Sequence, residues 1–455
     1  MSVSVEQNDN VLSLWKDFSQ STGFHGINKL SHSTNKLRLI IWSIVLLACT
    51  TFLVLFVTTQ IIDYYNYPVN TNMHTETHSE LQFPAVTVCN LNSLKRNSIL
   101  NDTRMENHYL KLSLFDVYAT PSNWSDPFFQ EQNFFEKRTL NDVFQDHKIR
   151  SQAWVFDGRD LDAKEYVSFF ILRSGPCLTF DPNGQITADI TGSNFNLNAW
   201  IDIDAENDYF GESYGTGIKF KIHDPREYPD FDGISEYYVE PGHEIYAAIT
   251  KNKFEYLSKP YKAMGNNYCR EKRNSDGTDY YSTHCFKDCF ARHMVASCGC
   301  IDFTANNTLY CSKFDVENCT KDIDATTRLL KTCDCPMSCE FTRYDARITS
   351  ILFPSEFNVE QLKRFWLPYW DINYYRKNLI NLRIYFDQLK TIVSKQTPKY
   401  SAGEMFANLG GMMGLFLGAS IVTMTELGEF VFTNLWLLIT RLKTGGKTAV
   451  KPGKA

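Results

Sequence analysis

The stretch "LGGMMGLFLGAS", residues 409–420, lies within an uncharged run from Met405 to Thr425. This run of 21 residues is long enough for a membrane-spanning helix. It contains glycines at positions 410, 411, 414 and 418, although glycine destabilises a helix by about 1 kcal/mol relative to alanine. The composition therefore predicts a membrane segment in which close helix contact, or a break in the helix, matters more than helix stability.

A second apolar run, Leu39 to Ile62, predicts another membrane helix nearer the N-terminus. Its 24 uncharged residues would span about 36 Å as a helix, enough to cross the hydrocarbon core with some tilt. The run is too long for a cleaved signal peptide and has no small-residue cleavage site before Asp63. We therefore predict a signal-anchor helix.

The charges beside the two segments predict their orientation. Five basic residues and no acidic residue follow the second segment: Arg441, Lys443, Lys447, Lys451 and Lys454. Cytoplasmic flanks usually carry such an excess of positive charge. We therefore predict a two-pass protein of the plasma membrane. Its parts would be a cytoplasmic N-terminus (1–38), a first membrane helix (39–63), an extracellular domain (64–400), a second membrane helix (401–440) and a cytoplasmic tail (441–455).

The cysteines and glycosylation sequons of the predicted extracellular domain indicate a protein that folds in an oxidising compartment. It holds 12 of the 13 cysteines, whereas Cys49 lies in the first membrane segment. It also contains four N-glycosylation sequons, at Asn101, Asn123, Asn306 and Asn318. These features disfavour the alternative of a cytosolic metal protein.

Alternating apolar residues predict several strands in this domain, such as "FPAVTVCNL" (83–91), "GTGIKFKIH" (215–223) and "NLINLRIYFDQLKTIVSK" (378–395). Helical patterns occur at 325–332 and 355–370. The predicted fold class is therefore α+β, with two membrane helices flanking a large disulfide-rich domain.

The spacing of the cysteines predicts a nested set of disulfides. Cys285 and Cys289 would share one face of a helix, and Cys333 and Cys335 would share one face of a strand. Bonding these faces in antiparallel register gives six pairs, although sequence alone does not prove connectivity: Cys89–Cys177, Cys269–Cys339, Cys285–Cys335, Cys289–Cys333, Cys298–Cys319 and Cys300–Cys311. A zinc site at "CDCPMSC" (333–339) is the alternative. An oxidising compartment favours disulfides, so we predict no metal site.

Catalytic motifs are matched only in part. "GESYG" (211–215) fits the nucleophile elbow G-x-S-x-G, but a strand-like pattern follows where that motif needs a helix. "GGKT" (445–448) lacks the first glycine of a phosphate-binding loop, because Arg441 stands there. The net charge of −6 argues against a nucleic-acid partner. We therefore expect neither an enzyme nor a cofactor.

Glu426 and Glu429 follow the glycine-rich stretch and have apolar sequence on both sides. They are three residues apart and so share a helix face, and intramembrane carboxylates normally face a wet cavity or a partner. With the glycines they favour a cation pore, since carbonyls and carboxylates attract positive ions. Two alternatives stay open: the glutamates reach the membrane interface, or the glycines serve only helix packing.

The sequence also resembles a known family. "GGMMGLFLGASIVTMTELGEF" (410–430) is similar to the pore helix of the degenerin/epithelial sodium channel family, and "FPAVTVCNLN" (83–92) resembles the strand after its first membrane helix. Four stretches match its cysteine-rich pattern in order: "GPCLTF" (175–180), "VEPGHE" (239–244), "YSTHCFKDCFARHMVASCGC" (281–300) and "CDCPMSC" (333–339). The resemblance runs from about residue 24 to 440 and includes "HG" at His25–Gly26.

The resemblance implies a homo- or heterotrimer with related subunits, with a sodium-preferring pore that amiloride-type compounds block. It implies a selectivity filter at Gly418, Ala419 and Ser420, and a gating role for His25 and Gly26. Membrane lipid is a further expected partner. The remaining pore candidates are three acidic rings and two outer-pore positions: Glu426, Glu429 and Glu404, then Asn408 and Gly411.

Departures from the family pattern bear on gating. Tyr67-Pro68-Val69 stands where acid-opened members carry histidines, and Tyr261 stands where a tryptophan commonly precedes Cys269. An aromatic contact between Tyr67 and Tyr261 would couple the membrane helices to the extracellular domain. The segment between Cys89 and Cys177 has no dense acidic cluster. These departures favour an extracellular peptide ligand, as in the family's invertebrate neuropeptide-gated branch.

Several alternatives remain. The channel could open in response to acid or mechanical force, or conduct constitutively. An ATP-gated two-pass channel would need a concentrated basic cluster outside, which the sequence lacks. From another class, the chain could be a two-pass cell-surface binding protein that conducts nothing.

Overall fold

The computed structural model describes residues 11–31, 33, 35–92, 150–161, 166–171, 175–181, 183–207, 215–229, 235–271, 279–298, 333–365 and 371–445. The chain divides into two compact units. We call Met1–Asn70 together with Pro398–Ala455 the membrane unit, and Thr71–Thr397 the sheet unit.

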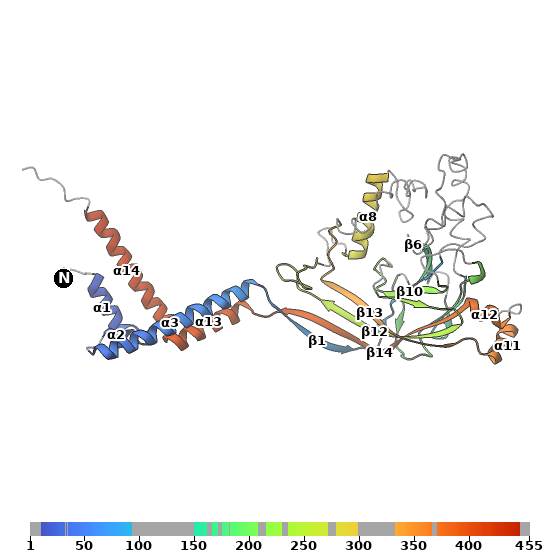
Figure 1. Cartoon of the computed structure of the whole chain (residues 1–455), viewed down its shortest axis with the longest axis horizontal. Helices are drawn as coiled ribbons and strands as arrows, with labels where there is room; N and C mark the ends of the chain where they lie inside the picture. Colours follow the sequence, from blue (N-terminus) through green and yellow to red (C-terminus); the bar gives the residue numbers. More distant parts are fainter. Residues whose placement is uncertain are drawn as a thin grey trace, which may run out of the picture. The chain divides into compact units, whose positions relative to one another are not determined.

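The described part of the membrane unit is helical (Figure 1). Its helices are α1 (Val11–Ser21), α2 (Ile27–Ser31), α3 (Lys36–Tyr65), α13 (Ala402–Leu417) and α14 (Ile421–Gly445). α13 runs beside α3, where Phe52 stacks on Phe416 with ring centroids 6.4 Å apart. Among the described residues, the helices long and apolar enough to cross a membrane are Lys36–Tyr65 and Ile421–Thr440.

One predicted membrane span corresponds to a single helix, and the other corresponds to two. The predicted span 39–63 lies within α3, which begins where the side chain of Asn35 accepts the N–H of Leu37. The predicted span 401–440 is instead two helices, α13 and α14, because residues 418–420 are not helical. The glycine-rich run therefore ends one helix and precedes another.

The sheet unit contains two large sheets. The seven-stranded sheet has the order β13 (Glu340–Leu352), β12 (His243–Glu255), β14 (Leu379–Pro398), β9 (Leu197–Asp202), β4 (Arg150–Phe156) and β5 (Arg159–Asp160), and β1 (Val69–Thr77) also pairs with β14. The five-stranded sheet has the order β11 (Glu236–Val239), β10 (Ile218–His223), β3 (Ala85–Asn90), β7 (Gly175–Phe180) and β6 (Tyr166–Ile171). The strands β2 (Leu81–Gln82) and β8 (Thr187–Ala188) form a small third sheet.

Short helices complete the described sheet unit. They are η3 (Ala205–Asn207), α8 (Ser282–Cys298), α11 (Glu356–Phe365) and α12 (Ile372–Asn378). Asp371 caps the start of α12: its carboxylate accepts the N–H of Tyr374 at 2.8 Å and so satisfies one of the free donors of the first turn.

A single apolar core joins the two large sheets. At its centre Phe83 is fully buried and packs edge-to-face on Phe156, Phe180 and Phe386, with centroids 5.1, 6.0 and 5.6 Å away. Phe180 belongs to the five-stranded sheet, whereas Phe156 and Phe386 belong to the seven-stranded one. The ring of Phe83 therefore holds the two sheets against each other.

The predicted strands correspond to observed ones. The stretches 83–91, 215–223 and 378–395 contain β3, β10 and most of β14. The helical pattern at 355–370 contains α11, whereas 325–332 lies outside the described residues. The mixed helix and strand fold with candidate membrane helices near both ends of the chain is confirmed.

The structure contains four of the six predicted disulfides: Cys89–Cys177, Cys269–Cys339, Cys285–Cys335 and Cys289–Cys333. Cys89 and Cys177 are buried and lie opposite each other on β3 and β7. The other two predicted pairs, Cys298–Cys319 and Cys300–Cys311, and the four sequons fall wholly or partly outside the described residues.

One premise of the disulfide prediction was wrong. Cys285 and Cys289 lie on helix α8 as predicted, but Cys333 and Cys335 do not lie on a strand. The N–H of Cys335 instead donates to the carbonyl of Cys333 at 2.9 Å, in a tight local turn. Pro336 follows and has no N–H to offer to a strand partner, and β13 begins only at Glu340.

Candidate pore and gating site

The break between α13 and α14 falls at Gly418–Ala419–Ser420. Gly418 caps α13 in the left-handed conformation, with φ +64°, and its N–H donates to the carbonyl of Gly414 at 2.9 Å. Glycine adopts this conformation without the steric cost that a Cβ atom brings. The expected filter residues are therefore the non-helical link of a broken membrane segment.

Ser420 begins α14. Its hydroxyl accepts the N–H of Thr423 at 3.3 Å, while the Thr423 hydroxyl accepts the N–H of Ser420 at 2.6 Å. The Thr423 hydroxyl also donates to the carbonyl of Ser420 at 2.8 Å. This reciprocal capping satisfies donors that the first turn of a helix otherwise leaves free.

The segment between α1 and α2 packs against this break and against the start of α14. The N–H of His25 donates to the carbonyl of Leu417 at 2.8 Å. A Cβ atom added to Gly418 would overlap the imidazole ring of His25, and one added to Gly26, whose φ is +88°, would meet Leu46 of α3. The expected gating residues and the expected filter are therefore in direct contact.

Toward the N-terminus, this segment and the end of α1 lie along one face of α14, antiparallel to it. Oε2 of Glu426 accepts the N–H of Gly23 at 3.2 Å and the hydroxyl of Thr22 at 3.4 Å. One turn further on, Phe430 stacks on Phe18, with centroids 4.6 Å apart. We call residues 15–25 the N-terminal strap; it contacts α14 at positions spaced three and four residues apart.

The other expected pore residues lie on helix surfaces. Glu404 caps α13: its carboxylate accepts the N–H of Ser401 at 2.8 Å. Asn408 and Gly411 follow at helical spacing on the same face, and all three are exposed in the single chain. Glu429 is likewise exposed, whereas Glu426 is partly covered by the strap.

Sequence reasoning identified His25 and the neighbouring Gly26, but it missed the other residues of the strap and it missed Thr423. One signal was available, because the apolar residues of 11–21 have helical spacing and give α1 an amphipathic face. The expected contact of Tyr67 with Tyr261 joins residues of different units and stays a prediction.

A second candidate region lies on the sheet unit, between β10 and α8. His223 is buried; its Nδ1–H donates to the carbonyl of Asp224 at 2.9 Å and its Nε2 accepts the hydroxyl of Thr87 at 2.8 Å. Burial lowers the pKa of His223 to about 4, so it is neutral at physiological pH. Burial, and then the charge of Asp224, raise the pKa of Glu227 to about 7.

The loop that carries Glu227 contacts helix α8 directly. The ammonium of Lys287 lies 4.6 Å from the ring centroid of Tyr228, and His284 meets the same ring edge-on at 6.5 Å. Arg226 pairs with Asp224 at 3.0 Å. Glu227 therefore lies next to a contact between this loop and the disulfide-bonded helix, while the charges that shift its pKa, those of Asp224, Lys221 and Arg226, lie on β10 and on the loop itself.

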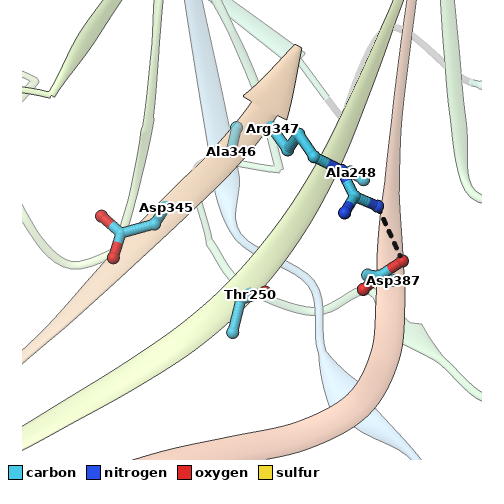
Figure 2. A pocket seen from close by; sticks show the side chains of 6 residues that line it. All are labelled: Ala248, Thr250, Asp345, Ala346, Arg347 and Asp387. Atoms are coloured by element: carbon cyan, nitrogen blue, oxygen red, sulfur yellow. Dashed lines mark hydrogen bonds and ion pairs between the residues drawn. The ribbon is translucent and has the colours of Figure 1, made fainter. Parts of the chain in front are cut away.

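The sheet unit also has a shallow pocket of about 230 Å³ on β12, β13 and β14. Figure 2 shows Arg347 crossing Ala248 to reach Asp387, and the two charges lie 3.4 Å apart. Asp345 already binds Asn252 at 2.7 Å and Arg343 at 3.0 Å. The charges of this pocket are therefore paired within the chain.

Comparison with known proteins places these features in a family. The sequence matches the amiloride-sensitive sodium channel family over residues 18–430. The chain belongs to this family. Its members are ion channels and not enzymes, and they are multi-subunit assemblies. The matched range includes the strap from Phe18, the filter candidate and Phe430.

Two relatives cover most of this channel subunit. The bile acid-sensitive ion channel of Mus musculus is 29% identical, over 93% of this chain and 88% of its own. Acid-sensing ion channel 1A of Danio rerio is 26% identical, over 91% of this chain and 87% of its own. The chain is therefore a cation channel subunit with two candidate membrane-spanning helices.

Proposed function

We propose that this chain forms a trimeric, sodium-selective channel of the plasma membrane, with both termini in the cytoplasm, and that an extracellular peptide opens it. Gly418–Ser420 is the selectivity filter. The observation that carries the proposal is the break of the second membrane segment at these three residues, against which His25 packs. A non-helical backbone at membrane depth is tolerated where it is buried in protein or lines a wet passage.

The filter assignment predicts the effect of widening the Ser420 side chain. Ser420→Leu is expected to abolish the current or to change the sodium-to-potassium permeability ratio roughly tenfold, because an apolar side chain replaces a polar group at the narrowest point. Reversal potentials in bi-ionic solutions give the ratio. Unchanged selectivity at normal surface expression would remove the filter from residues 418–420.

The acidic side chains of Glu426 and Glu429 predict a second result. Each is proposed to attract cations to the pore below the filter, so Glu426→Gln and Glu429→Gln are each expected to lower single-channel conductance roughly twofold. Glutamine keeps an oxygen that can accept the Gly23 N–H, so it removes the charge and preserves the strap contact. If only Glu429→Gln lowers conductance, Glu426 anchors the strap without lining the pore.

The proposed stimulus is a peptide because tyrosine, proline and valine stand at 67–69, where acid-opened members carry histidines. The test is direct: currents are recorded from cells expressing the chain, alone and with related subunits, during application of amidated neuropeptides, bile acids and acid steps. Bile acids are included because a relative is named for them. A response to bile acid or acid alone would exclude peptide gating, and no current with any partner would favour a binding protein.

Acid gating is a second candidate because the pKa of Glu227 lies near 7. The charged groups around it are Asp224, Lys221 and Arg226. The pKa of the Glu227 carboxyl group rises from 4.5 to about 7 on folding. The folded protein therefore binds this proton more tightly than the unfolded chain does, and protonation of Glu227 stabilises the fold. The free energy of unfolding therefore falls as pH rises through this range and recovers on acidification, by up to roughly 3 kcal/mol.

Glu227→Gln is accordingly expected to stabilise the sheet unit at pH 8 and to leave its stability near pH 4 almost unchanged. The midpoint of thermal unfolding of the purified channel, measured at both pH values, checks this. If acid opens the channel through this loop, the same variant also loses its response to a step from pH 7.5 to 6. Equal pH dependence in both proteins would show that Glu227 titrates near its ordinary pKa.

A further inference from the structure

We infer that Thr423 is the positioning residue of the filter: it fixes the backbone of Ser420 and, through its methyl group, seats the N-terminal strap. This inference rests on the proposed filter at Gly418–Ser420. Thr423 lies one turn below the filter on α14 and is only 6% exposed. Its two functional groups point to two different partners.

The hydroxyl of Thr423 faces the filter. It accepts the N–H of Ser420 at 2.6 Å and donates to the Ser420 carbonyl at 2.8 Å. Both polar groups of the Ser420 backbone thus contact this one side chain, and the carbonyl also accepts the N–H of Met424 at 3.0 Å as the first backbone hydrogen bond of α14. Threonine divides between two χ1 rotamers in a helix, and the two hydrogen bonds to Ser420 favour the one observed.

The methyl group of Thr423 faces the strap. A Cβ atom built on Gly23 would lie 2.5 Å from Cγ2 of Thr423, far inside van der Waals contact. The backbone of Gly23 therefore rests directly on this methyl group. Cγ2 cannot turn away without rotating χ1, and that rotation would break both hydrogen bonds to Ser420.

The two contacts make Thr423 a mechanical link between the strap and the filter. The strap is fixed on either side of Gly23 by the His25 N–H on Leu417 and by Thr22 on Glu426. A displacement of the strap therefore changes the packing against Cγ2. Because hydroxyl and methyl share one rotamer, such a displacement also strains the hydrogen bonds of the hydroxyl to the N–H and carbonyl of Ser420.

Two single substitutions separate the functional groups. Thr423→Val keeps the shape and loses the hydroxyl, and it is expected to shift the sodium-to-potassium permeability ratio roughly threefold or more. Thr423→Ser keeps the hydroxyl and loses Cγ2, so it is expected to preserve selectivity and to change the open probability. Thr425→Val is the matched control, since the exposed hydroxyl of Thr425 donates to Val422 within its own helix at 2.7 Å.

A compensating pair tests the contact itself. Gly23→Ala alone is expected to reduce current roughly tenfold, because its new methyl group overlaps Cγ2 of Thr423. Adding Thr423→Ser removes that very atom, so the double variant is expected to recover most of the current. Surface labelling of each variant reports whether the protein reaches the membrane.

The outcomes distinguish this inference from the filter proposal. If Ser420→Leu alters selectivity but Thr423→Val does not, the filter stands and Thr423 does not position it. If adding Thr423→Ser does not restore the current of Gly23→Ala, while the single and double variants both reach the surface, the methyl contact does not link the strap to the filter. If neither Ser420→Leu nor Thr423→Val alters selectivity, the filter assignment itself is wrong.

Discussion

Gly418→Ala is expected to reduce the current at least roughly tenfold in a channel that still reaches the cell surface. Two effects act together. A residue with a Cβ atom in the left-handed conformation costs about 1–2 kcal/mol, and Gly418 has φ +64°. The new methyl group would also overlap the imidazole of His25, which is held by the hydrogen bond from its N–H to Leu417. The strap would have to leave the filter or the break would have to refold.

The control for this prediction is Gly428→Ala on α14. Among the described residues, no atom outside the adjoining backbone of α14 lies within 4 Å of the Cβ position of Gly428, so alanine there should only stabilise the helix, by about 1 kcal/mol. Whole-cell current divided by surface-labelled protein is the measurement for both variants. Normal current in Gly418→Ala would mean that the left-handed link and the His25 contact are not needed for conduction.

The same region shows what the sequence could and could not predict. Glycine content and length were enough to predict a membrane segment with either close helix packing or a break, because glycine has a direct effect on local backbone freedom, and the structure shows a break at residues 418–420. The contacts of the strap were out of reach of such reasoning. Thr22 and Glu426 are 404 positions apart, and no local pattern reports a hydrogen bond between distant residues.

In the sheet unit, too, local patterns predicted the strands but not the effects of contacts between distant residues. Alternation predicted β3 and β10 because apolar residues recur at every second position, as with Ile218, Phe220 and Ile222, although the structure buries nearly every residue of both strands. It predicted nothing about the raised pKa of Glu227, which arises from burial and then from the charge of Asp224. The pairing of Cys285 with Cys335 was predicted from spacing, although the backbone of Cys335 is not a strand. A disulfide requires proximity of two Cβ atoms, and several backbone conformations provide it.

The largest effect on stability is expected at Phe83. Phe83→Ala should lower the free energy of unfolding of the sheet unit by about 3–5 kcal/mol, because the ring is fully buried among Phe156, Phe180 and Phe386. These rings come from both large sheets, so the cavity would open at their shared core and not at one edge. A loss of this size is a large fraction of the stability of a typical domain. We expect little of the variant to reach the cell surface at 37 °C.

Phe195→Ala is the matched control for Phe83→Ala, since it removes the same atoms from a side chain that is 42% exposed. It is expected to cost less than about 1.5 kcal/mol, because part of the ring already contacts solvent. The midpoint of thermal unfolding and the surface-labelled fraction are measured for both proteins. Equal losses would mean that the two sheets do not depend on a common core at Phe83. A loss confined to Phe83→Ala would show that the stability of the sheet unit depends on the core that its two large sheets share.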